Sequence, residues 1–78
     1  DMEMIEEVRQ VVCGITGLAP DFDTSANLYA DLGVPSVQAM QLLTELEERF
    51  GIALPDEDFI EAVSLQDLSS LVGRIKGA

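Results

Sequence analysis

Hydrophobic residues recur at helical spacing in two long segments of the chain. Between residues 2 and 16, apolar positions repeat every three or four residues with acidic and amide side chains outside the stripe, which predicts a first helix. Gly17 ends it, and Pro20 follows. The segment from Ser36 to Phe50 predicts a second helix that stops before Gly51. Its buried stripe is expected to comprise Ala39, Leu42, Leu43, Leu46 and Phe50.

Two shorter segments complete the helical pattern. Pro55 and the three acidic residues after it suit the first turn of a short third helix, which we expect Phe59 and Ile60 to anchor. Ser64 and Asp67 have the spacing of a capping box and open a last helix. No segment alternates convincingly with period two. The pattern therefore predicts an all-α fold, a small four-helix bundle of three main helices and one short helix, in a single domain spanning residues 1–78.

A long connection, residues 18–35, separates the first two helices and is rich in turn-forming residues. Loops of this length inside a compact domain are usually functional. Five apolar side chains are expected to pin the connection to the core: Leu18, Phe22, Leu28, Tyr29 and Leu32.

The same connection invites comparison with a calcium-binding loop. Asp21, Asp23, Ser25 and Asn27 occupy the first, third, fifth and seventh places of an EF-hand pattern. The pattern then fails, because Ala26 stands where glycine is needed and Leu32 where a bidentate glutamate is needed. We expect no dedicated metal site, although weak binding of divalent ions by clustered carboxylates stays open.

The charge balance narrows the possible partners. Fifteen acidic residues against four basic ones give a net charge of -11 in 78 residues. Nucleic acid and anionic membrane surfaces repel such a chain. A basic protein surface attracts it over a long range. An apolar fraction of 47% with only 5% aromatic residues predicts a compact core built from Leu, Ile, Val and Met.

The side chains that most enzymes use are missing. Without histidine the chain has no Ser-His-Asp or Cys-His set and lacks the commonest general base. Cys13, the only cysteine, lies in an apolar run and is expected to be a buried structural thiol. We therefore expect no enzyme. The absence of a signal peptide and of an apolar run long enough to span a bilayer favours a cytoplasmic protein.

The segment around Ser36 carries a family resemblance. Residues 31–37, DLGVPSV, resemble the carrier-protein signature in which Asp-Leu-Gly precedes an Asp-Ser-Leu triplet. Further matches follow in order at residues 42–50, 52–58 and 64–68, so that they cover nearly the whole chain. The chain thus resembles the acyl carrier protein family of phosphopantetheine-binding carrier proteins.

This resemblance implies a covalent cofactor. Ser36 would accept 4'-phosphopantetheine from coenzyme A in a reaction run by a separate transferase. The thiol of the arm would then hold acyl intermediates as thioesters, while the chain itself catalyses nothing. A serine hydroxyl at a helix start suits this role, because free backbone N–H groups and the positive end of the helix dipole favour a phosphate. Taken alone, Ser36 also suits a plain N-terminal helix cap.

The resemblance also implies a recognition surface on the second helix. Carboxylates there would meet basic docking patches on the transferase and on acyl-processing enzymes, and apolar side chains would add contact near the arm. The residues implied are Asp31, Val37, Met40, Glu45 and Glu48. Such contacts should be fast, weak and salt-sensitive. We expect a monomer.

Two departures from the signature bear on function. Pro35 replaces the aspartate that normally precedes the serine, and Val37 replaces the leucine that follows it. We hypothesise that Pro35 narrows the choice of transferase and that the chain is a specialised carrier for fatty-acid or polyketide-type synthesis. Two alternatives stay open: a peptidyl or aminoacyl carrier of non-ribosomal synthesis, and an unmodified acidic interaction module with a carrier fold.

Overall fold

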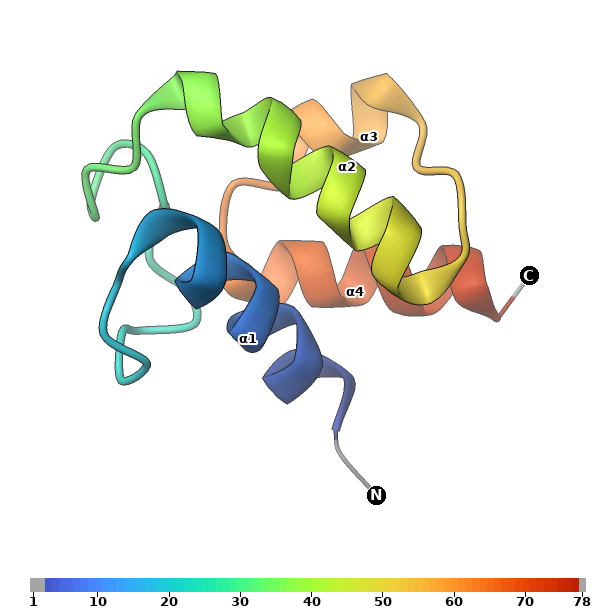
Figure 1. The fold of residues 1–78 in the computed structure, drawn as a ribbon, viewed down its shortest axis with the longest axis horizontal. Coiled ribbons are helices and arrows are strands. Elements are labelled where there is room, and N and C mark those ends of the chain that lie inside the picture. The colour runs from blue at the N-terminus through green and yellow to red at the C-terminus, as the bar shows by residue number, and fades with distance from the viewer. Residues whose placement is uncertain (1–2, 78) are drawn as a thin grey trace.

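The computed structural model describes residues 3–77 and forms a bundle of helices, as predicted (Figure 1). Helix α1 packs against both α2 and α4, and the short α3 packs on α4. The elements in chain order are α1 (Met4–Thr16), the 3-10 turn η1 (Ser36–Gln38), α2 (Ala39–Phe50), α3 (Asp56–Glu61) and α4 (Leu65–Lys76). The all-α prediction is confirmed, with one isolated antiparallel bridge between Asn27 and Ser64. The predicted start of the first helix at residue 2 lies outside the described residues.

The helix boundaries follow from local sequence. The amides of Gly17 and Gly51 donate to carbonyls of the last turns of α1 and α2, as expected of C-terminal stops. The hydroxyl of Ser64 accepts a hydrogen bond from the Asp67 amide at 3.0 Å, which is the predicted cap of α4. Pro55 precedes α3 as its N-cap rather than opening it.

The core is built mainly from leucine and valine. Its fully buried side chains come from α1, the long connection, α2 and α4: Val8, Val12, Leu28, Leu42, Leu46, Leu65, Leu68 and Val72. Phe50 and Phe59 are buried as well, as expected from their places in the predicted helices, so the core is not built from Leu, Ile, Val and Met alone. The isoleucines and methionines that belong to this cluster pack only partly buried against it. At 25 cal/mol per Å² of apolar surface, these side chains are the main stabilising term of the fold.

An arginine of α1 holds the beginning of the long connection. The Arg9 guanidinium donates to the carbonyl oxygens of Pro20 at 2.7 Å and Phe22 at 3.0 Å. Its central carbon also lies 4.8 Å from the centre of the Phe22 ring, in cation–π geometry. Three contacts from one side chain therefore fix a segment that has no helix of its own.

The later part of the same connection is fastened to the start of α4. The Leu28 amide donates to the Val63 carbonyl at 2.8 Å, and the Gln66 amide donates to the Thr24 carbonyl at 3.0 Å. Leu28 is fully buried, and the other four predicted anchors of the connection pack partly buried on the core. The expectation that apolar residues pin the loop is confirmed.

Two expectations about single side chains were wrong. Ile60 does not anchor α3, because it is 71% exposed and only its neighbour Phe59 turns into the core. A two-turn helix has room for few inward positions, and spacing alone does not tell which side it presents. The Cys13 thiol is partly exposed rather than buried, although the burial that it has raises its pKa.

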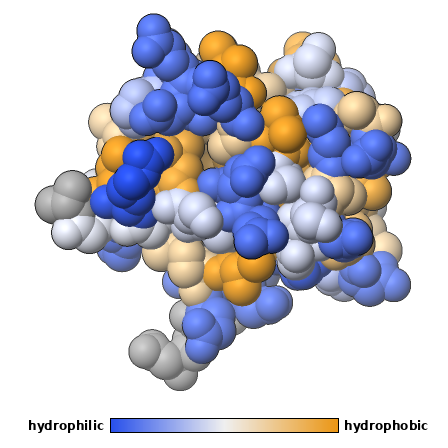
Figure 2. Space-filling model, turned by 180° about the vertical axis from the view of Figure 1, so that it is seen from behind, coloured by the Kyte–Doolittle hydropathy of each residue, from blue (hydrophilic) through white to orange (hydrophobic). Residues whose placement is uncertain are grey.

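Hydrophilic and apolar side chains are mixed on the face seen in Figure 2. On the side opposite to that of Figure 1, apolar side chains surface in separate areas between hydrophilic ones (Figure 2). Among the helices of the described chain, none has both the length and the apolar character that crossing a membrane requires.

Candidate functional site

Ser36 stands at the end of a tightly shaped loop segment. Val34, two residues earlier, is buried, and its amide donates to the Leu28 carbonyl at 2.9 Å. Gly33 has a φ of 75°, a left-handed conformation that residues with a side chain rarely adopt, so the chain can reverse there. Pro35 then fixes an extended backbone directly before Ser36. The backbone thus holds Ser36 in one defined position.

The hydroxyl of Ser36 is not used by the fold. Ser36 is exposed and is the first residue of η1, whose N-cap is Pro35 and has no side-chain cap. The interpretation of Ser36 as a helix cap is therefore wrong. Within residues 3–77 its hydroxyl makes no hydrogen bond, so it is free to react. The predicted second helix also begins later than expected, since residues 36–38 form a 3-10 turn, which is common at helix starts.

An apolar groove opens beside this serine and runs between α2 and α3. One hollow of about 200 Å³ is lined by Ser36 together with Tyr29, Ala39, Phe59, Ile60 and Val63. A second, of about 210 Å³, is lined by Ala39, Met40, Leu43, Asp56, Phe59 and Ile60. Because the two share three lining residues, we treat them as one feature and call it the α2–α3 groove. Its lining fits a flexible arm with an apolar load that starts at an exposed hydroxyl.

Tyr29 adds a polar group to the mouth of the groove. Its ring lines the same hollow as Ser36 and is partly buried. This burial raises the pKa of the Tyr29 phenol above its ordinary value, so the hydroxyl stays protonated at neutral pH. A protonated phenol is a hydrogen-bond donor for amide or phosphate oxygens.

The residues predicted to meet partners fall into three groups. Val37 and Met40 are exposed next to Ser36. Glu48 is exposed on the second half of α2, whereas Glu45 is half-buried and lines the crevices between α1 and α2. Asp31 is exposed in the loop, where its carboxylate accepts a hydrogen bond from the Asn27 amide at 2.9 Å. Met40 and Glu45 nevertheless line one shared hollow with Ile15 of α1, so an apolar and an acidic member of the predicted set meet there.

Ile60 and Tyr29 belong to the site and were missed by sequence reasoning. Tyr29 had been assigned to loop packing, and Ile60 to the core. The signal for Tyr29 was its place two residues before the DLGVPSV segment, where the loop must pass close to Ser36. No local pattern reports the outward position of Ile60.

The residues that resembled a calcium loop serve the loop itself. Asp23 accepts hydrogen bonds from the amide and the hydroxyl of Ser25, and these bonds lower the pKa of its carboxyl. The Asn27 side chain accepts from the amides of Tyr29 and Ala30. Across residues 3–77, no group of three or more metal-binding side chains comes together.

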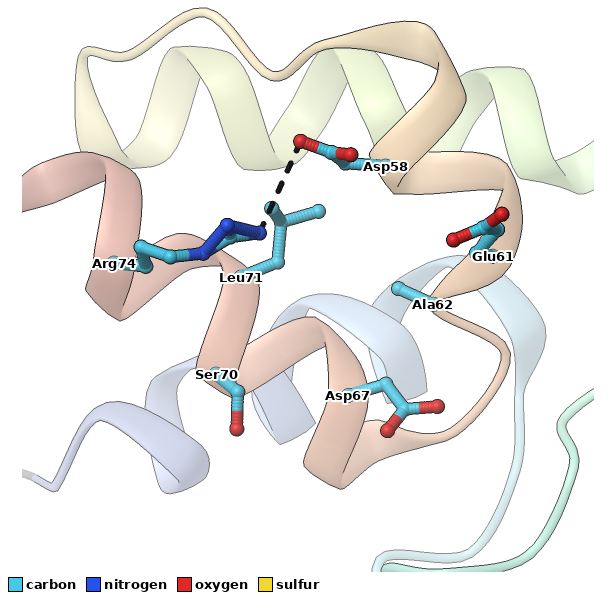
Figure 3. A pocket seen from close by; sticks show the side chains of 7 residues that line it. All are labelled: Asp58, Glu61, Ala62, Asp67, Ser70, Leu71 and Arg74. Carbon is cyan, nitrogen blue, oxygen red and sulfur yellow. Dashed lines mark ion pairs between the residues drawn. The ribbon is translucent and has the colours of Figure 1, made fainter.

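A separate hollow of about 390 Å³ lies between α3 and α4, away from the groove, and shares no lining residue with the hollow at Ser36 (Figure 3). Arg74 extends toward Asp58 across it, at 3.8 Å, while Glu61 and Asp67 stand at its edge. Both partners of this ion pair are largely exposed, so it contributes little to stability.

Known proteins resemble this chain over most of its length. The family model described as a phosphopantetheine attachment site matches residues 6–72. An acyl carrier protein of Campylobacter hominis is 36% identical, covering 91% of each chain. Those of Solidesulfovibrio magneticus and Akkermansia muciniphila are each 30% identical; the first covers 97% of this chain and 99% of its own, the second 99% and 98%.

Proposed function

This chain belongs to the acyl carrier protein family, and we propose that Ser36 bears the 4'-phosphopantetheine that the family carries covalently on its attachment domain. Members of this family are carriers rather than enzymes. The observation that supports this most directly is the free, exposed hydroxyl at the mouth of an apolar groove. The family model spans this position.

The chain's own residues prepare the attachment and leave the chemistry to another protein. The Ser36 oxygen would attack the coenzyme A phosphate that bears the pantetheine arm, the pyrophosphate bond would break, and adenosine 3',5'-bisphosphate would leave. The chain has no histidine to take the serine proton, so a base of the transferase would take it. Val34 and Gly33 hold the loop so that this oxygen projects from one fixed point. When bound, the arm supplies a thiol that carries acyl groups as thioesters.

The α2–α3 groove shelters the cargo in this proposal. Its lining is apolar apart from Ser36, the Tyr29 hydroxyl and Asp56, which suits a hydrocarbon chain. An acyl carrier for fatty-acid or polyketide-type synthesis, of a specialised kind, is therefore favoured over a peptidyl or aminoacyl carrier. We further propose a cytoplasmic monomer, folded as one domain over residues 1–78, that binds basic docking patches on its partner enzymes, consistent with its net charge of -11.

Intact mass tests the attachment site. The unmodified chain, incubated with coenzyme A and a broad-specificity phosphopantetheinyl transferase, is expected to gain the mass of one arm. Ser36→Ala is expected to gain none, while Ser70→Ala, which changes an exposed serine on α4, is modified like the wild type. A mass gain in Ser36→Ala would refute the proposed site. No gain in the wild type would instead favour an unmodified interaction module.

A further inference from the structure

A crevice opens on the side of α2 that faces α1. One hollow of about 360 Å³ is lined by Ile15 of α1 and by Met40, Gln41, Thr44 and Glu45. A neighbouring hollow of about 270 Å³ is lined by Gln10, Val11, Gly14, Ile15, Glu45 and Arg49. Because the two share Ile15 and Glu45, we treat them as one feature and call it the α1–α2 crevice. It shares no lining residue with the hollow at Ser36.

Glu45 is half-buried, lines both hollows and has no partner of its own. Arg49 stands four residues after it, at the spacing that pairs opposite charges on a helix. The Arg49 guanidinium instead donates to the side-chain oxygen of Gln10 on α1, at 3.0 Å. In the described part of the chain, residues 3–77, the Glu45 carboxylate makes no hydrogen bond and no ion pair. A carboxylate that has lost part of its water is stabilised by an incoming cation.

The hollow on the Met40 side suits an arginine side chain in particular. It contains one carboxylate and no basic residue, whereas Arg49 lines the other hollow and would repel a cation there. Ile15 and Met40 supply apolar walls for the methylene groups of an arginine. The side-chain oxygens of Gln41 and Thr44 are neutral acceptors on the same hollow. A guanidinium has five N–H donors in a planar fork, so it can use several acceptors at once.

We propose that the Met40 side of the α1–α2 crevice binds an arginine side chain of a partner enzyme, with the guanidinium on the Glu45 carboxylate. This rests on the proposed function for the kind of partner, and it adds α1 to the surface that meets the partner. The net charge of -11 attracts basic surfaces from every direction, and the crevice gives this attraction one defined contact. The contact itself occupies neither Ser36 nor the hollow beside it.

Amide chemical shifts of the isotope-labelled, unmodified chain test the crevice, with acetyl-Leu-Arg-Leu-amide as the probe. The largest shifts are expected at Ile15, Met40 and Glu45. The same peptide with citrulline, which keeps the shape of arginine without its charge, should leave these signals in place. A lysine version should bind more weakly, because an ammonium lacks the planar fork of donors.

Two substitutions that add the same positive charge make the test specific. Gln41→Arg places a guanidinium on the hollow, four residues before Glu45, and is expected to weaken binding of the arginine peptide about fivefold. Gln66→Arg, an exposed change on α4, should weaken it less than about twofold. Glu45→Gln should abolish the shifts, whereas Glu48→Gln, outside the crevice, should keep them. Melting temperatures of the four variants verify that each one is folded.

The outcomes separate this contact from general attraction to an acidic chain. Equal weakening by the two arginine variants, or binding of the citrulline peptide, would overturn the contact. So would shifts in α3 as large as those at Ile15 and Glu45, or no shift in a large excess of the arginine peptide. Each of these results leaves the attachment at Ser36 intact, because the chain is tested unmodified. A missing mass gain in the wild type would instead refute the attachment and leave these shifts in place.

Discussion

The two segments that flank the groove differ in how they are held. The long connection before Ser36 is not helical, yet Arg9, the buried Leu28 and amides paired with residues near the start of α4 fix it at both ends. Helix α3 has regular structure, but Phe59 is its single buried residue. The amide of Leu54, which precedes α3, is held by the Glu47 carboxylate at 2.8 Å.

This contrast separates regular structure from local stability. Local opening costs most where apolar surface is buried and backbone groups are paired inside the protein, whatever the secondary structure. By this measure the irregular connection belongs to the stable part, and the helical α3 to the part that opens first. The division suits a carrier, because the proposed attachment point at Ser36 stays fixed while one wall of the groove can move.

Replacing the main buried side chain of the connection and that of α3 is expected to produce the largest difference in stability. Leu28→Ala should lower the free energy of unfolding by about 3 kcal/mol, since a fully buried leucine is lost from the centre of the fold. Phe59→Ala should cost only about 1.5 kcal/mol, because α3 detaches before the rest unfolds. Urea titrations give both values, and hydrogen exchange should show faster exchange confined to α3 in Phe59→Ala. Equal losses of unfolding free energy in the two variants, with faster amide exchange throughout the chain in Phe59→Ala, would contradict the difference between the connection and α3.

Two arginine variants test the same comparison with a smaller expected change in stability. Arg9→Met removes two hydrogen bonds and a cation–π contact from the connection and should cost about 1–2 kcal/mol. Arg74→Met removes the same charge from the exposed pair with Asp58 on α3 and should cost less than about 0.5 kcal/mol. Thermal melts at one ionic strength compare them. If the two variants melt together, net charge and not the loop contacts sets the effect.

The smallest effect is expected from the turn at Asp23. Hydrogen bonds from Ser25 lower the pKa of this carboxyl in the folded chain, below its ordinary value of 3.8. The charged form therefore stabilises the fold above that value, and this contribution is lost as pH falls through the folded pKa. Asp23→Asn should be slightly less stable than the wild type at neutral pH, and the two should converge in acid. A difference that grows on acidification would contradict this assignment.

Much of the fold could be predicted from the sequence, because helical stripes and caps are local. The stripes in α1, α2 and α4, the stops at Gly17 and Gly51, and the cap at Ser64 depend on residues within a few positions of one another. The pairing of Leu28 with Val63 depends on residues far apart in the chain and has no local signature. The 3-10 turn at Ser36 and the orientation of α3 were missed for a similar reason, since short elements contain too few residues to define a period.

The site could be predicted in part for the same reason. Ser36 and Val37 stand in the DLGVPSV segment and Met40 follows three residues after it, and all three are exposed. The partner role of Val37 and Met40 stays a prediction. Ile60 reaches the groove only through the packing of α3 against the bundle. Asp31 has a second role, as acceptor for the Asn27 amide, that charge patterning does not reveal.

The bond from Leu28 to Val63 also bears on how the protein is made at the ribosome. A growing chain cannot form this bond until Val63 has left the exit tunnel, which is later than the emergence of both α1 and α2. Until then the Leu28 amide lacks the Val63 carbonyl as its acceptor, and the loop before Ser36 is not yet folded. If Ser36 is the attachment point proposed above, its modification is expected only after the segment with Val63 has emerged.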